Sequence, residues 1–195
     1  MGNRPNSQML YDIVEAQAGY FTSKQAAKAG YSWERLSENT SSGKFQRIET
    51  GVYRLRQFPT TAMEEFFIAL LKAGEKAVIS HESALVVYDL SDVMPGIIHV
   101  TIPRTSSRRR NGLQFHTKQI SEDEVTVYSG LRVTNIPRTI IDLLESGCDF
   151  GIIKDSITQA VKRGMVSYDE IDRFSIGKSK KIIEQINQII DGGNG

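Results

Sequence analysis

The apolar residues at the start of the chain recur at the spacing of amphipathic helices. Leu10 and Val14 lie on one face of a helix that is predicted to begin near Asn6 and to end at Gly19. Two shorter polar–apolar segments follow, separated by a tight turn that contains Gly30. The pattern therefore predicts three helices, the last two joined by a glycine turn.

The starts of the second and third helices carry capping signals. Thr22 and Gln25 have the spacing of a capping box, in which each side chain bonds the backbone N–H of the other. Ser32 is predicted to cap the third helix, with Tyr31 packing on Leu36 as a hydrophobic staple.

After the third helix, the period changes from helical to alternating. Residues 45–48 (FQRI) and 52–55 (VYRL) are predicted to form two strands around a glycine turn. Phe45 and Arg47 would share one side of the first strand, so its alternation is not clean. Together with the helices, this hairpin predicts a winged helix-turn-helix domain over residues 1–57, with FPTT as the linker.

The remainder, residues 58–195, mixes both periods and predicts an α+β domain. Thr61 and Glu64 have the spacing of a capping box before a helix that ends at Gly74. Ser129-Gly130 is a hairpin signal between two of the strands. The predicted strands are the segments 77–80, 97–103, 113–117, 125–129 and 131–134.

Helices are expected between and after these strands. Ser80 could cap the segment HESALVVYDL, and Pro137 suits the first turn of the next helix. A helix is predicted over 149–163, another after a capping box at Ser167 and Glu170, and an isoleucine-rich helix at the end. Residues from about 192 to 195 are expected to be disordered. The overall fold class is α+β.

Charge changes this picture, because it is unevenly distributed. The chain has a net charge of +1, but residues 1–57 hold eight basic and five acidic side chains. That skew favours an anionic partner for the first domain. The single Cys148 excludes an internal disulfide and a cysteine zinc cluster. The chain has neither a long apolar run nor a signal-peptide core, so we expect a soluble, cytoplasmic protein without a membrane partner.

The first turn of the third helix holds the leading candidates for base contacts. The second helix of a helix-turn-helix motif lies in the major groove and directs its first turn at base edges. Ser32 could bond a phosphate or base, Trp33 could pack on sugar or a thymine methyl, and Arg35 could bind guanine. Ser37 lies on the same helix. Alternatively, Trp33 covers the small core and Arg35 only solvates the helix.

The predicted wing supplies further polar and basic side chains. Wings commonly lie over the DNA backbone or minor groove, where cations neutralise phosphates. The alternative is an ordinary solvated hairpin. The candidates are Lys44, Gln46, Arg47, Arg54 and Arg56.

A loop in the second domain, PRTSSRRRNG, crowds four arginines into seven residues. Their mutual repulsion would be relieved by an anionic partner, so we expect a second contact with nucleic-acid phosphates; the alternative is a solvated loop. The four are Arg104, Arg108, Arg109 and Arg110.

No metal or cofactor site is predicted. His81-Glu82 begins like a zinc-protease motif, but Leu85 stands where the second histidine is required. His99 and His116 lie on separate predicted strands. IGKS at residues 176–179 lacks the earlier glycine of a phosphate-binding loop.

Catalytic signatures are likewise missing from the sequence. No acidic residue is followed two positions later by Lys, as a restriction-type nuclease would need, and Asp-x-Asp pairs do not occur. We therefore predict that the protein is not an enzyme. The alternatives are a metal-dependent nuclease guided by the winged helix, using Asp89, Asp92 and Glu122–Glu124, or an adaptor that binds another protein.

Five blocks occur in a familiar order: FTSKQAAKAGYSWERL, GKFQRIETGVYRL, AVISHESAL, IHVTIP and GLRVTNIPRTIIDLL. From about Gln8 to Arg173, this order resembles the AbiEi-type antitoxins of bacterial type IV toxin–antitoxin systems, which act in abortive infection against phage.

The resemblance implies an N-terminal winged helix, with the recognition helix from Ser32 to about Ser41 and the wing from Phe45 to Leu55, and a C-terminal antitoxin domain. It also implies repression of the protein's own operon through promoter inverted repeats. A nucleotidyltransferase-like AbiEii toxin would be countered without a stable complex. One winged helix contacts few base pairs, so we expect largely monomeric copies that bind repeated half-sites cooperatively.

Overall fold

The computed structural model describes residues 5–91, 96–103 and 112–193. Its contacts divide the chain into two compact units, Met1–Lys76 and Ala77–Gly195, which we call the N-unit and the C-unit. Each unit is described by itself.

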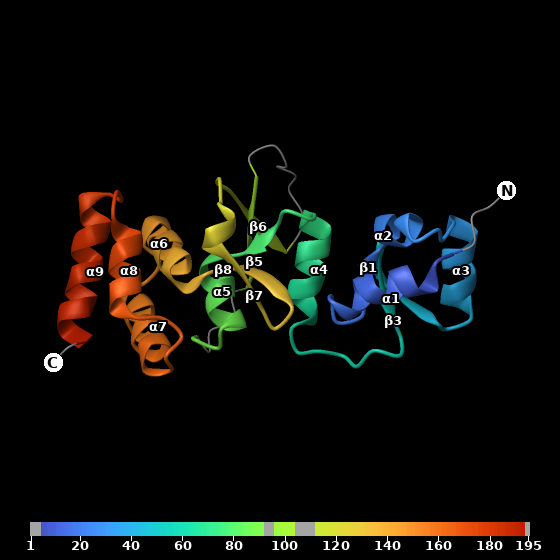
Figure 1. Cartoon of the computed structure of the whole chain (residues 1–195), viewed down its shortest axis with the longest axis horizontal. Coiled ribbons are helices and arrows are strands. Elements are labelled where there is room, and N and C mark those ends of the chain that lie inside the picture. Colours follow the sequence, from blue (N-terminus) through green and yellow to red (C-terminus); the bar gives the residue numbers. More distant parts are fainter. Residues whose placement is uncertain (1–4, 92–95, 104–111, 194–195) are drawn as a thin grey trace. The chain divides into compact units, whose positions relative to one another are not determined.

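The N-unit is a winged helix-turn-helix (Figure 1). Its three-stranded sheet has the order β1-β3-β2, and both pairings are antiparallel. Strand β1 is only three residues long, and the sequence pattern did not predict it. The elements are α1 (Ser7–Glu15), β1 (Tyr20–Thr22), α2 (Ser23–Lys28), α3 (Trp33–Ser41), β2 (Phe45–Glu49), β3 (Val52–Leu55) and α4 (Glu64–Ala73).

The capping signals of α1, α2 and α3 are confirmed. Asn6 caps α1, and Thr22 and Gln25 form the predicted capping box of α2. The Ser32 hydroxyl accepts from the Arg35 backbone N–H at the start of α3. One apolar cluster joins these helices to the sheet, and its members include Leu10, Val14, Phe21, Ala26, Tyr31, Leu36, Phe45 and Tyr53.

A β-bulge explains part of the uneven alternation of β2. Arg47 pairs with Tyr53 and Glu49 pairs with Val52, so Ile48 is the extra residue. Phe45 is buried, whereas Arg47 is exposed. The bulge accounts for Ile48, which is half-buried whereas Gln46 is exposed; it lies after Arg47 and does not account for the difference between Phe45 and Arg47.

Helix α4 belongs to the N-unit, so the unit extends to Lys76 rather than ending at Gln57. Phe67 on α4 stacks on Tyr20 of β1 with the ring centroids 6.0 Å apart. The predicted capping box before α4 does not form: Met63 is the N-cap, and its N–H bonds the Thr61 hydroxyl at 3.2 Å.

The C-unit contains a mixed five-stranded sheet of order β6-β5-β4-β8-β7. Strand β5 runs parallel to β6 and antiparallel to β4, while β8 runs parallel to β4 and antiparallel to β7. The elements are β4 (Val78–Ile79), α5 (His81–Val87), β5 (Ile98–Ile102), β6 (Leu113–Thr117), the 3-10 turn η1 (Glu122–Glu124), β7 (Val125–Tyr128), β8 (Leu131–Thr134), α6 (Ile136–Ser146), α7 (Phe150–Lys162), α8 (Tyr168–Ser175) and α9 (Lys180–Gly193).

Local signals position most of these elements. Ser129 and Gly130 both have positive φ, as the two central residues of a type I′ hairpin turn require. Ser167 and Glu170 form the predicted capping box of α8. Helix α9 continues to Gly193, so residues 192 and 193, expected to be disordered, are helical. Among the described residues, no helix combines the length and hydropathy needed to cross a lipid bilayer.

Candidate nucleic-acid interface

The first turn of α3 presents large polar side chains outside a complete core. Leu36 faces inward and is only 3% exposed, whereas Trp33 is 65% exposed. Arg35 and Ser37 are also exposed. The alternative in which Trp33 covers the core is therefore wrong. What the turn offers is a broad aromatic face beside a guanidinium.

Ser32 sits at this helix start with both hydrogen-bonding roles in use. Its hydroxyl accepts from the Arg35 backbone N–H at 3.4 Å. A hydrogen bond from the same hydroxyl is the main cause that lowers the pKa of Glu34. Ser32 therefore orients the first turn, and a DNA contact by its hydroxyl would compete with the cap.

Two basic residues of the hairpin, Lys44 and Arg56, lie at its open end, and Arg47 lies midway along β2, opposite Tyr53. The Arg56 N–H donates to the Lys44 carbonyl at 3.2 Å, so these two residues are neighbours across the strands. Lys44, Gln46, Arg47 and Arg56 are all exposed. In the chain, Lys44 follows closely on the C-terminal end of α3.

Arg54 does not belong to this surface. It is 7% exposed, its guanidinium donates to the Phe58 carbonyl, and it lies 5.8 Å from the centroid of the Tyr20 ring. A buried guanidinium held in this way is unavailable to phosphate, so its role is to fix the segment after β3. Arg54 pairs across the strands with Gln46, which is exposed. The alternation of the sequence therefore did not predict that Arg54 is buried.

The tip of the hairpin is held by the rest of the N-unit. The Ser23 N–H donates to the Gly51 carbonyl at 3.0 Å. Beside the turn, Glu49 forms an ion pair with Lys72 of α4 at 3.1 Å. This short tip is thus tied to α2 and α4, and Lys44 and Arg56 lie at the other end of the hairpin.

The predicted arginine-rich contact lies outside the described residues, because Arg104 and Arg108–Arg110 fall in the interval 104–111. Asp92, one of the acids of the nuclease alternative, also lies outside them. Three of the other acids have basic partners: Glu124 contacts Arg138 at 2.6 Å, Glu122 contacts Arg132 at 3.4 Å, and Asp89 contacts Arg163 at 3.7 Å.

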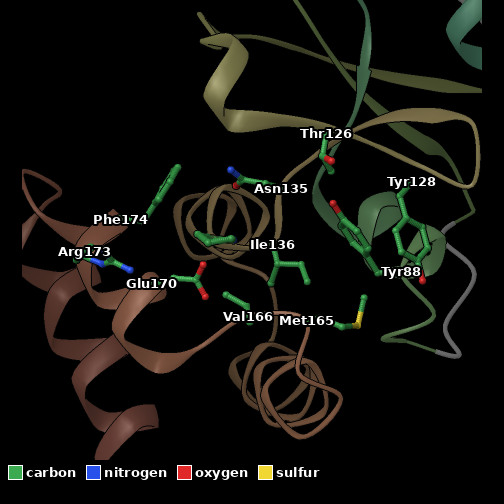
Figure 2. A pocket seen from close by; sticks show the side chains of 11 residues that line it. Tyr88, Thr126, Tyr128, Asn135, Ile136, Met165, Val166, Glu170, Arg173 and Phe174 are labelled. Carbon is green, nitrogen blue, oxygen red and sulfur yellow. The ribbon is translucent and has the colours of Figure 1, made fainter.

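A cavity of about 650 Å³ lies in the C-unit among β7, α6 and α8 (Figure 2). Tyr88 and Tyr128 line one end, with ring centroids 4.9 Å apart, and Arg173 lines the other. Its Glu170 caps α8, and its Asn135 caps α6. These two polar side chains of the lining therefore serve the starts of helices.

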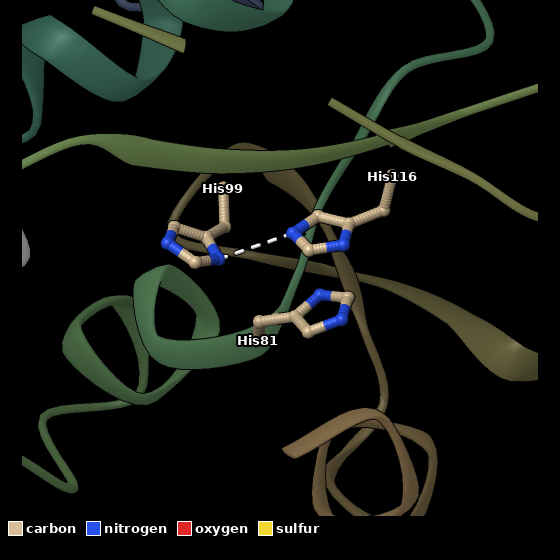
Figure 3. Close-up of side chains that lie close together, drawn as sticks. All are labelled: His81, His99 and His116. Carbon is tan, nitrogen blue, oxygen red and sulfur yellow. Dashed lines mark hydrogen bonds between the residues drawn. The ribbon is translucent and has the colours of Figure 1, made fainter. Parts of the chain in front are cut away.

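The structure brings together three histidines that the sequence placed on separate elements (Figure 3). One nitrogen from each of His81, His99 and His116 lies within 4.8 Å of the others. The signal missed in the sequence was the parallel pairing of β5 with β6, which links residues about 15 positions apart.

One comparison with known proteins finds a match for the segment that contains α3 and the hairpin. Residues 8–56 match the family model described as "Transcriptional regulator, AbiEi antitoxin". The resemblance is confirmed over this segment, which carries the winged helix and supports a DNA-binding antitoxin. No curated protein shows a significant match in sequence.

Among solved structures, the chain resembles the crystal structure of the RV2827C protein from Mycobacterium tuberculosis. The TM-score is 0.55 at 10% identity, and the alignment covers 98% of this chain and 79% of that one. This likeness concerns the fold alone.

Proposed function

We propose that the protein is a DNA-binding antitoxin that represses its own operon. It would bind inverted repeats in the promoter and counter a nucleotidyltransferase-like toxin of the AbiEii type without a stable complex. The observation that carries the DNA-binding part is the first turn of α3, where Trp33 and Arg35 are exposed beside a completed core. The family match over residues 8–56 supports the antitoxin part.

In this proposal, α3 enters the major groove with its first turn against base edges. Arg35 donates to guanine, and Trp33 packs on a sugar or a thymine methyl group. Lys44 and Arg56 lie beyond the other end of a nine-residue helix, roughly 12 Å along its axis. That separation is comparable to the width of the major groove, about 12 Å, so the two cations would neutralise flanking phosphates.

The tethered hairpin tip limits what a single copy contacts. Because Gly51 bonds Ser23 and Glu49 pairs with Lys72, the tip is not free to extend into a minor groove. Base contacts would come from α3 alone, which spans only a few base pairs. Useful specificity then requires several copies on repeated half-sites, bound cooperatively by largely monomeric protein.

A gel-shift titration tests the DNA-binding part. DNA from upstream of the protein's own gene is titrated with scrambled DNA as competitor, at two salt concentrations. Arg35→Ala should weaken specific binding by roughly 5- to 150-fold, the range of one bidentate base contact. Arg173→Ala is the matched control, because this exposed arginine lies on α8 of the C-unit.

Stepwise shifts of the promoter DNA that resist the scrambled competitor would support autoregulation. Shifts that the scrambled DNA removes as well as promoter DNA does would contradict it. Charge removal at Arg108–Arg110 should weaken binding to every sequence and reduce its salt dependence.

For the antitoxin part, co-expression with the cognate toxin should restore growth while a pull-down recovers no complex. Incubation with nucleic acid and Mg²⁺ or Mn²⁺ should leave the substrate intact.

A further inference from the structure

The three histidines converge because of strand register and one unusual backbone angle. Thr101 of β5 pairs with His116 of β6, so His99, two residues before Thr101, shares a face of the sheet with His116. His81 is the first residue of α5 and has a φ of +54°. This left-handed conformation is uncommon outside glycine. The chain has three histidines in all, and every one lies in this group.

At the centre of the three histidines, more hydrogen-bond acceptors meet than there are protons to share among them. His99 Nδ1 lies 3.1 Å from His116 Nε2 and 3.0 Å from Glu82 Oε2. A single proton on Nδ1 cannot serve both well. The Glu82 Oε2 atom is buried and makes no well-aligned hydrogen bond among the described residues, although His99 Nδ1 lies 3.0 Å away and the Cys148 thiol interacts with the same carboxylate. A buried acceptor left in this state is costly, which points to a missing positive group.

The third imidazole is already oriented for a ligand. His81 is 1% exposed, and its Nδ1 lies 2.9 Å from the Ser80 hydroxyl. That hydroxyl also accepts from Thr101 at 2.8 Å. With Nδ1 engaged in this way, Nε2 is the nitrogen left for coordination, and such outer hydrogen bonds commonly orient metal-bound histidines.

We propose that His81, His99, His116 and Glu82 bind one zinc ion. Three imidazoles and one carboxylate are a ligand set that zinc accepts in tetrahedral geometry. Zinc–nitrogen bonds of about 2.0–2.1 Å place neighbouring ligand nitrogens about 3.4 Å apart. The present separations, up to 4.8 Å, require a small contraction.

Binding also requires one ring to turn. His81 stacks on His116 with the ring centroids 3.5 Å apart and the planes 16° from parallel. The lone pairs of stacked imidazoles lie in two separate, nearly parallel planes, and one ion cannot lie in both, so the ion would draw the His81 ring out of the stack. The nitrogen-rich set favours zinc over magnesium or calcium, which prefer oxygen ligands.

The surrounding charges are compatible with a cation. Lys118 pairs with Asp142 at 3.1 Å and with Glu145 at 2.5 Å. Arg138 pairs with Asp142 at 3.1 Å and with Glu124 at 2.6 Å. Both positive groups near the histidines are therefore neutralised by carboxylates, and Glu82 is left to offset the charge of the ion.

The protonation of the imidazoles agrees with the geometry. Burial lowers the pKa of His81 to about 3, and burial is also the main cause that lowers the pKa values of the other two histidines. The rings are uncharged at neutral pH, which is the form that binds a metal. A closed site of four protein ligands would tie α5 to β5 and β6, which is a structural role.

Zinc binding to the untagged full-length chain tests this proposal. Competition with a chromophoric chelator should give one zinc per chain. His99→Gln and His116→Gln should each weaken the affinity by about 100-fold or more, since even outer-shell changes cost 10- to 100-fold. Glu82→Gln should also weaken it, and Glu122→Gln is the matched control because Glu122 is exposed and pairs with Arg132.

A second measurement needs no variant. Long-range ¹H–¹⁵N spectra of the wild-type imidazoles should show all three histidines shifting when zinc is added. No uptake at tenfold excess zinc would overturn the proposal. So would imidazole signals that stay unchanged, or folded histidine variants that bind zinc as tightly as the wild type.

Discussion

The N-unit exposes the polar side chains discussed above, whereas the C-unit buries some of its charged side chains. In the N-unit, Trp33 and Arg35 project outward from a helix whose Leu36 completes an apolar core. In the C-unit, polar groups lie inside: Asp142 is fully buried and Arg138 is 6% exposed. The difference teaches that polar side chains of the N-unit can be changed without opening the core, whereas a change at Arg138 or Asp142 of the C-unit breaks a buried ion pair.

The largest effect is expected from Arg138→Ala. Arg138 bonds the buried carboxylate of Asp142 and the half-buried carboxylate of Glu124. Removing one partner of a buried ion pair should lower the free energy of unfolding by about 3–5 kcal/mol. Urea unfolding followed by circular dichroism measures it. Arg132→Ala is the matched control, because its pair with Glu122 is exposed and should contribute under about 1 kcal/mol. Equal losses would erase the contrast between buried and exposed charge.

Leu36→Ala should be next in size. Leu36 is 3% exposed and anchors α3 to the core, and its truncation should lower the free energy of unfolding by about 2–5 kcal/mol. Ile176→Ala is the control of similar size, because Ile176 is 75% exposed. The urea midpoint should shift for the first variant and hardly at all for the second. A small shift for Leu36→Ala would mean that α3 is held by other contacts.

Ser32→Ala should cost less, about 1 kcal/mol, because it removes the N-cap of α3. Ser37→Ala, inside the same helix, should be neutral or slightly stabilising, because alanine has the higher helix propensity. The melting temperatures of both variants distinguish the effect of the cap from the effect of a serine-to-alanine change inside the helix. Indistinguishable melting temperatures would show that the cap does not set the start of α3.

Trp33→Ala should change stability least, within about 0.5 kcal/mol, because its side chain is 65% exposed. Its affinity for promoter DNA should nevertheless fall, as measured by gel shift. Val127→Ala is the control, because Val127 is similarly exposed at 67% but lies on β7 of the C-unit. A destabilised Trp33→Ala with unchanged DNA affinity would reverse the interpretation of the N-unit.

Local rules predicted much of the fold. The capping boxes at Thr22 and Ser167 and the turn at Ser129-Gly130 are set by residues within four positions of one another, and all three are present. Thr61 shows the limit of such rules. It has the correct spacing to Glu64, yet its hydroxyl bonds the Met63 N–H and α4 begins without a side-chain cap.

The candidate sites were predictable only where they depend on one element. The exposed turn of α3 follows from its own helix, so Trp33 and Arg35 were identified from sequence. Arg54 was misplaced because its burial depends on the Phe58 carbonyl and the Tyr20 ring, which lie on other segments. The histidine group was missed for the same reason, since it needs the pairing of β5 with β6 and the start of α5.

Because the hairpin tip of the N-unit is tied to α2 and α4, it is a poor position for a label. Tips of surface hairpins are usually the first choice for inserting an epitope or a fluorophore-binding tag. At Thr50-Gly51, an insertion would displace the Gly51 carbonyl from Ser23 and move Glu49 away from Lys72. The turn at Ser129-Gly130, whose strand β7 lies at the edge of its sheet, is the better position for such a probe.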